Sequence, residues 1–141
     1  MIKVIYWSQT GNTEEMAKAV AEGITEKGKE AKLLNFYGLS SSELDSDNVF
    51  AMGCPAMGGE ELEDSDVEPF VEELTGRVSG KKIALFGSYG WGDGEWMRNW
   101  VERMSSAGAE IIGGEGVICQ GAPDTEDIKR LKELGNKLAE C

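Results

Sequence analysis

Apolar residues along the chain follow two alternating patterns, short unbroken runs and longer stretches in which they recur at helical spacing. Residues 4–7 form an unbroken apolar run that ends at a polar turn, which predicts a buried strand. Met16, Val20 and Ile24 then recur at helical spacing, so residues 14–27 are predicted to form a helix. The chain therefore begins with a strand, a short polar turn and a helix.

The same alternation continues to the end of the chain. Further strands are predicted over residues 32–36, 48–54 and 82–87, and a fifth over 110–112 and 116–119, interrupted at Gly113 and Gly114. Further helices are predicted over residues 40–44, 67–74, 95–104 and 124–138. Five β–α units in 141 residues predict an α/β fold, a single domain (residues 1–141) with a doubly wound, five-stranded parallel sheet flanked by helices.

Composition indicates a soluble globular protein. Charged residues make up 28% and hydrophobic residues 40%, and no apolar run reaches the length of a membrane-spanning helix. Met1 leads directly into the first strand rather than into a signal peptide. The three cysteines (Cys54, Cys119 and Cys141) are widely spaced, and the chain has no histidine. We therefore expect no disulfide framework, no ordinary metal site and a cytoplasmic location.

Negative charge is concentrated in one region of the chain. The net charge is −12, and residues 33–76 contain eleven acidic residues and no Lys or Arg. The rest of the chain is nearly neutral, with fifteen acidic residues against fourteen basic ones. This distribution disfavours nucleic acid and anionic membranes as partners and favours a basic protein surface.

The turn after the first strand, residues 8–13, has the composition of an anion site. Ser8, Thr10 and Thr13 offer hydroxyl groups, Gly11 allows close approach of the backbone, and the next helix contributes unpaired N–H groups. The turn has no Lys or Arg, so it differs from a nucleotide-hydrolysing phosphate loop and suits one terminal phosphate that is held rather than transferred. The alternative is a helix cap without a ligand, since caps use the same residue types.

Two more loops are expected beside this turn, because parallel α/β sheets bind ligands at the carboxyl ends of their strands. They are residues 54–60 and 88–94. Each displays a large apolar side chain among glycines, Met57 in one and Trp91 in the other. Two such side chains can enclose a flat ring. A phosphate on one loop and a ring between two others describe a mononucleotide cofactor.

Three motifs together resemble the short-chain bacterial flavodoxins, and the resemblance extends over the whole chain. They are the turn at residues 8–13, the Met-Gly-Gly-Glu turn at 57–60 and the Gly-Ser-Tyr-Gly-Trp-Gly loop at 87–92. The resemblance implies the sheet order 2-1-3-4-5 and non-covalently bound FMN that cycles through semiquinone and hydroquinone states. It also implies a monomeric, low-potential electron carrier with a ferredoxin-like role between redox partner proteins, and no substrate turnover of its own.

The resemblance also implies a cofactor site. In it the polar side chains of the first turn, Ser8, Thr10, Asn12 and Thr13, would hold the phosphate. Met57 would face the inner side of the flavin ring and Trp91 its outer side, while Glu60 would accept a hydrogen bond from ring N3. The implied site comprises Ser8, Gln9, Thr10, Gly11, Asn12, Thr13, Pro55, Ala56, Met57, Gly58, Gly59, Glu60, Ser88, Tyr89, Gly90, Trp91 and Gly92.

Two other function classes share this fold. A flavin enzyme such as a quinone reductase would need a substrate pocket and usually a longer chain. A receiver-type signalling domain would need acidic residues at the ends of the first and third strands, where Trp7 and Gly53 stand. Trp7, Trp96 and Trp100 fall on periodic elements, so we predict that they pack in the core, and we predict Cys54 and Cys119 to be buried.

Overall fold

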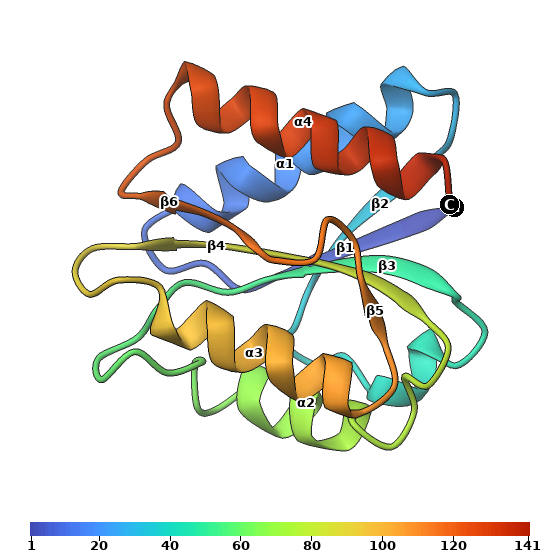
Figure 1. Cartoon of the computed structure of the whole chain (residues 1–141), viewed down its shortest axis with the longest axis horizontal. Coiled ribbons are helices and arrows are strands. Elements are labelled where there is room, and N and C mark those ends of the chain that lie inside the picture. Colours follow the sequence, from blue (N-terminus) through green and yellow to red (C-terminus); the bar gives the residue numbers. More distant parts are fainter.

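A parallel sheet forms the middle layer of the molecule, with two helices on each face (Figure 1). The computed structural model describes residues 1–141. The strands are β1 (Ile2–Tyr6), β2 (Ala31–Asn35), β3 (Val49–Gly53), β4 (Lys82–Tyr89), β5 (Glu110–Ile111) and β6 (Val117–Gln120). Their order is β2-β1-β3-β4, with β5 and β6 both paired to β4, which confirms the predicted order.

The short strands β5 and β6 are two parts of the predicted fifth strand. β5 pairs with the start of β4, where Ile83 lies opposite Ile111, and β6 pairs with the end of β4. Between them Gly113 (φ 82°) and Gly114 (φ 80°) adopt left-handed backbone conformations that glycine tolerates. The predicted interruption is therefore confirmed, and the chain turns away from the sheet edge at this point.

The helices α1 (Asn12–Glu26) and α4 (Thr125–Ala139) cover one face of the sheet, and α2 (Val67–Leu74) and α3 (Glu95–Ser106) cover the other (Figure 1). A 3-10 helix, η1 (Ser41–Leu44), precedes β3. Helix α1 begins two residues earlier than predicted, so Asn12 and Thr13 lie in its first turn. No helix is both long enough and apolar enough to cross a bilayer.

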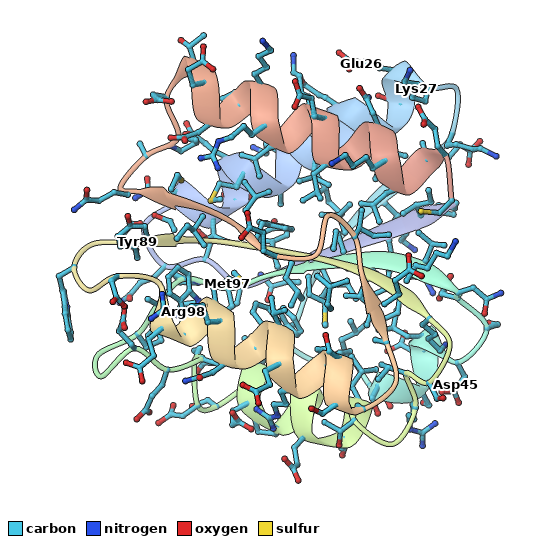
Figure 2. The ribbon with its side chains drawn as sticks, viewed as in Figure 1. Glu26, Lys27, Asp45, Tyr89, Met97 and Arg98 are labelled. Atoms are coloured by element: carbon cyan, nitrogen blue, oxygen red, sulfur yellow. The ribbon has the colours of Figure 1, made fainter.

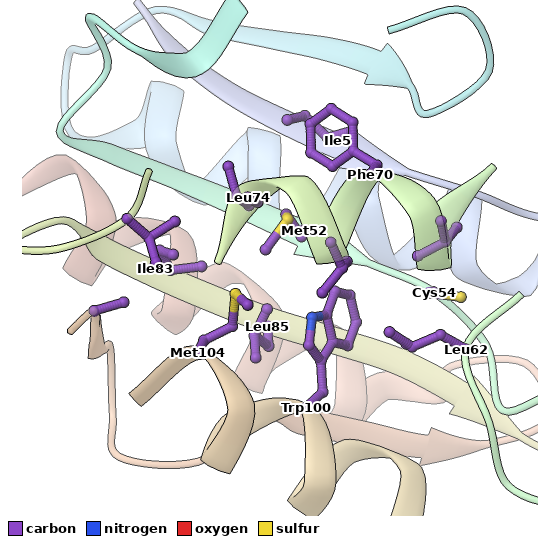
Figure 3. Packing of buried hydrophobic residues seen from close by; sticks show 14 of the residues in the cluster. Ile5, Met52, Cys54, Leu62, Phe70, Leu74, Ile83, Leu85, Trp100 and Met104 are labelled. Carbon is purple, nitrogen blue, oxygen red and sulfur yellow. The ribbon is translucent and has the colours of Figure 1, made fainter. Parts of the chain in front are cut away.

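Two apolar clusters, one on each face of the sheet, form the core. Successive residues of β1 enter opposite clusters, because strand side chains alternate between faces. Val4 joins the cluster that contains Leu131 of α4, and Ile5 joins the cluster that contains Trp100 of α3 (Figure 3). Because both faces of β1 are buried, the strand is apolar throughout, as its sequence pattern predicts.

The predictions for the tryptophans and the internal cysteines are confirmed. Trp96 and Trp100 are buried in the cluster beneath α2 and α3, and Trp7 is partly buried against it. The indole nitrogen of Trp96 donates to the carbonyl oxygen of Cys54 over 3.1 Å, which fixes the end of β3 to α3. Cys54 and Cys119 are both buried.

Candidate functional site

A cavity of about 230 Å³ opens at the carboxyl edge of the sheet, where three of the predicted loops meet. Tyr89 marks this edge at the end of β4 (Figure 2). The lining residues are Ser8, Gln9, Thr10, Asn12, Thr13, Pro55, Ala56, Met57, Ser88, Tyr89, Gly90 and Gly121. All of them except Gly121 belong to the site that the sequence predicts. Tertiary structure thus brings the three separate motifs to one cavity.

The hydroxyl groups of the first turn do not cap helix α1. Its N-cap residue is Gly11, with φ 96° and no side chain to offer. Ser8 Oγ accepts a hydrogen bond from the N–H group of Gly11 over 3.1 Å, which closes the turn ahead of the helix. The N–H groups of the first helical turn remain free for an acceptor in the cavity. This geometry favours the anion site over the alternative of a helix cap without a ligand.

Thr13 is the residue whose environment points most directly to a ligand. It is 1% exposed, and its Oγ1 atom is buried without any hydrogen-bond partner. A buried hydroxyl without a partner costs about 1–3 kcal/mol and is rare in folded proteins. Because Thr13 lines the cavity beside the positive end of the α1 dipole, an anionic oxygen there would satisfy it. No Lys, Arg or His lines the cavity, so neutral donors would hold that anion.

The turn after β3 is held closed by its own backbone. The N–H group of Met57 donates to Glu61 O and that of Glu60 donates to Met57 O, each over 2.9 Å. Gly59 has φ 83°, whereas Gly58 has no atom within 4 Å of the position that a Cβ would occupy. Met57 forms part of the cavity wall, and the two glycines form the exposed tip of the turn.

Glu60 has a different set of partners from the one that the resemblance implies. Its Oε1 atom accepts from the N–H groups of Asp93 (3.1 Å) and Gly94 (3.2 Å), and its Oε2 atom accepts from that of Glu95 (3.2 Å). The carboxylate therefore lies on the N-terminus of α3, and Glu60 is not among the residues that line the cavity. A contact between Glu60 and ring N3 stays a prediction.

The third predicted loop carries an unusually exposed indole. Trp91 is 64% exposed, although large aromatic side chains are usually mostly buried. Met57 lines the cavity, and Trp91 directly follows Gly90, a lining residue of the other loop, so the enclosure of a flat ring by these two side chains stays a prediction. The predicted site residues outside the cavity lining are Gly11, Gly58, Gly59, Glu60, Trp91 and Gly92.

The loop after β6 is the part of the cavity wall that the sequence does not reveal. Ser88 Oγ donates to Gly121 O over 2.6 Å, and the N–H group of Gly121 donates to Tyr89 O over 2.9 Å. Gln120 adds a bond from its side-chain amide to Gly90 O over 3.2 Å. These contacts use mainly backbone groups, which residue type does not disclose. The one available signal is strand order, which places the end of β6 beside the end of β4.

The two cysteines that adjoin the cavity, Cys54 and Cys119, are not reactive thiols. Burial raises the pKa of Cys54 to about 12, and burial raises that of Cys119 to about 11. Both thiols therefore remain protonated at neutral pH, and the thiolate that nucleophilic chemistry requires is absent.

A family model for flavodoxins matches residues 4–133. The chain belongs to the flavodoxin family. It is 46% identical to a flavodoxin of Clostridium beijerinckii over 138 residues, which cover 98% of this chain and 99% of that protein. It is 44% identical to a flavodoxin of Megasphaera elsdenii over 141 residues, the full length of both. The solution structure of two-electron-reduced Megasphaera elsdenii flavodoxin matches it with a TM-score of 0.88, 41% identity and full coverage of both chains.

Flavodoxin-family proteins bind FMN, and the cavity of this chain fits that cofactor. The unpartnered hydroxyl of Thr13 and the N-terminus of α1 suit one phosphate group. Met57 and the exposed Trp91 suit a planar ring. The lining has no cation for a second phosphate. When bound, FMN supplies one-electron and two-electron redox chemistry, and the chain's own residues hold and orient it.

Proposed function

We propose that this chain is a low-potential electron carrier that holds FMN non-covalently and passes electrons singly between redox partner proteins. The observation that carries the proposal is the buried, unpartnered hydroxyl of Thr13 in a cation-free cavity wall at a helix N-terminus. This wall would hold the phosphate with neutral donors. Met57 and Trp91 would enclose the ring and exclude water from its faces, with the backbone at Gly90 and Gly92 facing the ring edge.

The charge distribution supports a protein partner with a basic surface. Eleven acidic residues and no basic ones lie in residues 33–76, which include the β3–α2 loop beside the cavity. Four of them form ion pairs with Lys3, Arg77 or Arg103, and the unpaired carboxylates of the β3–α2 loop attract a basic protein at long range and repel nucleic acid. We further propose that the chain acts as a monomer in the cytoplasm, where its three free cysteines stay reduced.

Binding of FMN and of riboflavin, which lacks the phosphate, tests the site. Fluorescence titration should show tighter binding of FMN than of riboflavin. Thr13→Val should weaken FMN binding by about 10–100-fold, because hydrogen bonds to charged groups contribute about 1.5–3 kcal/mol, and should leave riboflavin binding unchanged. Thr25→Val, at the far end of α1, is the matched control and should change neither. Equal affinities of the wild-type chain for FMN and riboflavin would contradict the proposed phosphate site.

Trp91→Ala separates the ring contact from the phosphate contact. It should weaken FMN and riboflavin binding alike, by about 1 kcal/mol or more, because stacked aromatic rings contribute ~0.5–1.5 kcal/mol beyond the area they bury. Rapid oxidation of NAD(P)H by the purified FMN-loaded chain alone would contradict the carrier function and indicate a flavin enzyme.

A further inference from the structure

The loop between β3 and α2 carries two carboxylates that hold two different helices. Glu63 accepts from the N–H groups of Ser65, Asp66 and Val67, at the start of α2, the helix that follows it in the chain. Glu60, three residues earlier, reaches across to α3 instead. Its partners lie 33–35 residues away in the sequence. Glu60 therefore joins the Met57 turn to the loop that carries Trp91.

The backbone of Glu60 has a conformation that its surroundings must maintain. Glu60 has φ 53° and is the one non-glycine residue with a positive φ. A non-glycine residue in this region costs of order 1–3 kcal/mol and persists only when its surroundings hold it there. The backbone pairing of Met57 with Glu61 supplies part of that restraint. Three N–H groups at a helix N-terminus, donating to the Glu60 carboxylate, add to it through charge-assisted hydrogen bonds and the helix dipole.

The absence of a side chain at Gly92 makes room for the Glu60 carboxylate. A Cβ atom added to Gly92 would fall on the Oε1 atom of Glu60. Gly92 also has φ 89°, so its backbone favours glycine independently. The missing side chain at position 92 leaves the space that the Glu60 carboxylate fills.

We propose that Glu60 is a positioning residue, a latch that ties the Trp91 loop to the Met57 turn so that the two walls of the ring site keep one spacing. Its consequence for the ring rests on the proposed FMN site. The latch itself is a contact within the protein. An ionised carboxylate offers about four lone-pair sites, and α3 uses three of them. The latch therefore leaves room for one further donor, such as ring N3–H.

Amide hydrogen exchange of the full chain, FMN-loaded and FMN-free, tests the latch. Glu60→Gln should accelerate exchange at Asp93, Gly94 and Glu95 by about tenfold or more in both forms, because an amide is a weaker acceptor than a carboxylate. Exchange at residues 65–67, which Glu63 holds, should not change. Glu61→Gln, the exposed neighbour, is the matched control and should leave both groups of amides unchanged.

Gly92→Ala provides a second, independent variant. It should displace the intact carboxylate, accelerate exchange at residues 93–95, and add nothing further when combined with Glu60→Gln. Because the FMN-free chain contains no ring N3–H donor, faster exchange at residues 93–95 in that form reports the lost latch rather than a lost contact with the ring.

Unchanged exchange at residues 93–95 in the Glu60→Gln variant would overturn the latch while leaving FMN binding intact. Failure of the wild-type chain to bind FMN would instead overturn the proposed function. The exchange data from the FMN-free chain would still decide whether the latch exists.

Discussion

Gly58 and Gly59 are adjacent and both exposed, yet their backbones are constrained differently. Gly59 has φ 83°, a conformation that third positions of type II turns require and that side chains resist. Gly58 has a φ that other residues can adopt and open space around it. A Cβ on Gly58 would meet no atom and one on Gly59 would meet only the Glu61 side chain, so few neighbours restrict the peptide between the two glycines.

This freedom supports a prediction for Gly58→Thr. The family resemblance implies that the Gly58 carbonyl would accept a hydrogen bond from flavin N5 when that atom carries a proton, which requires the Gly58–Gly59 peptide to rotate. A β-branched residue resists such rotation, so the variant should have a first reduction potential lower by roughly 20–65 mV, the equivalent of one net hydrogen bond. Potentiometric titration measures this shift, and an unchanged first potential would mean that this carbonyl is not the partner of N5.

At the scale of elements, the N-termini of α2 and α3 are capped by carboxylates that lie outside these helices. Neither Asp66, the N-cap of α2, nor Gly94, the N-cap of α3, caps its helix with a side chain. Glu63 and Glu60 supply those acceptors from the same loop. One short segment therefore positions both helices and the turn that carries Met57.

Glu63 predicts a pH dependence of stability. Burial by itself raises the pKa of Glu63, but hydrogen bonds from the N–H groups of Asp66, Ser65 and Val67 lower it, and the net shift is downward. A carboxyl whose folded pKa is lowered stabilises the fold fully above its unfolded pKa of about 4.3 and loses that contribution as the pH falls through its folded pKa.

Glu63→Gln should accordingly reduce the free energy of unfolding by about 1 kcal/mol at pH 7, the usual effect of a lost cap, and by less near pH 3. Urea unfolding of the FMN-free chain at both pH values measures the difference without a contribution from cofactor binding. Glu61→Gln is the control for charge alone. A cost of Glu63→Gln that is equal at both pH values would show that ionised Glu63 is not the stabilising form.

At the scale of the whole molecule, the sheet separates the β3–α2 loop (residues 54–66), here called the acidic loop, from α1 and α4, which lie on the other face of the sheet (Figure 1). Glu61 and Asp64 are exposed and Asp66 is half-buried, whereas Glu63 is engaged with α2. The sequence places all four in the acidic region 33–76 without distinguishing them. In the structure Glu63 is hydrogen-bonded to the start of α2. A variant that tests the effect of free negative charge on the cofactor should therefore keep Glu63.

Neutralising Glu61, Asp64 and Asp66 together should raise the second reduction potential. The second electron adds negative charge near these residues, and one carboxylate ~10 Å away in water opposes it by about 0.4 kcal/mol, or roughly 20 mV. Three such charges correspond to about 60 mV at low salt, and the shift should nearly vanish at 1 M salt, where the screening length is about 3 Å.

A matched variant tests whether position or only net charge matters. Glu30→Gln, Glu133→Gln and Glu140→Gln remove the same charge before β2 and towards the end of α4. This variant should leave the second potential close to that of the wild type. Equal shifts in the two triple variants would contradict a local effect of the acidic loop.

The resemblance to the flavodoxins implied the sheet order, whereas the sequence by itself determined the order of elements and the three motifs that meet at the cavity. These features are local, because a strand or helix is encoded by the spacing of apolar residues within a few turns, and parallel β–α units leave few alternative arrangements. The exposed Trp91 and the hydroxyl-rich turn were recognisable because each departs from the pattern around it.

Only the tertiary structure decided the partners of individual groups. The orphaned hydroxyl of Thr13, the place of Gly121 in the cavity wall and the reach of Glu60 to α3 all depend on where distant strand ends meet. A loop carboxylate looks the same in the sequence whether it faces solvent, caps the helix that follows it or caps a helix elsewhere in the chain. Its partner is set by distances between segments more than 30 residues apart, and local periodicity carries no record of those distances.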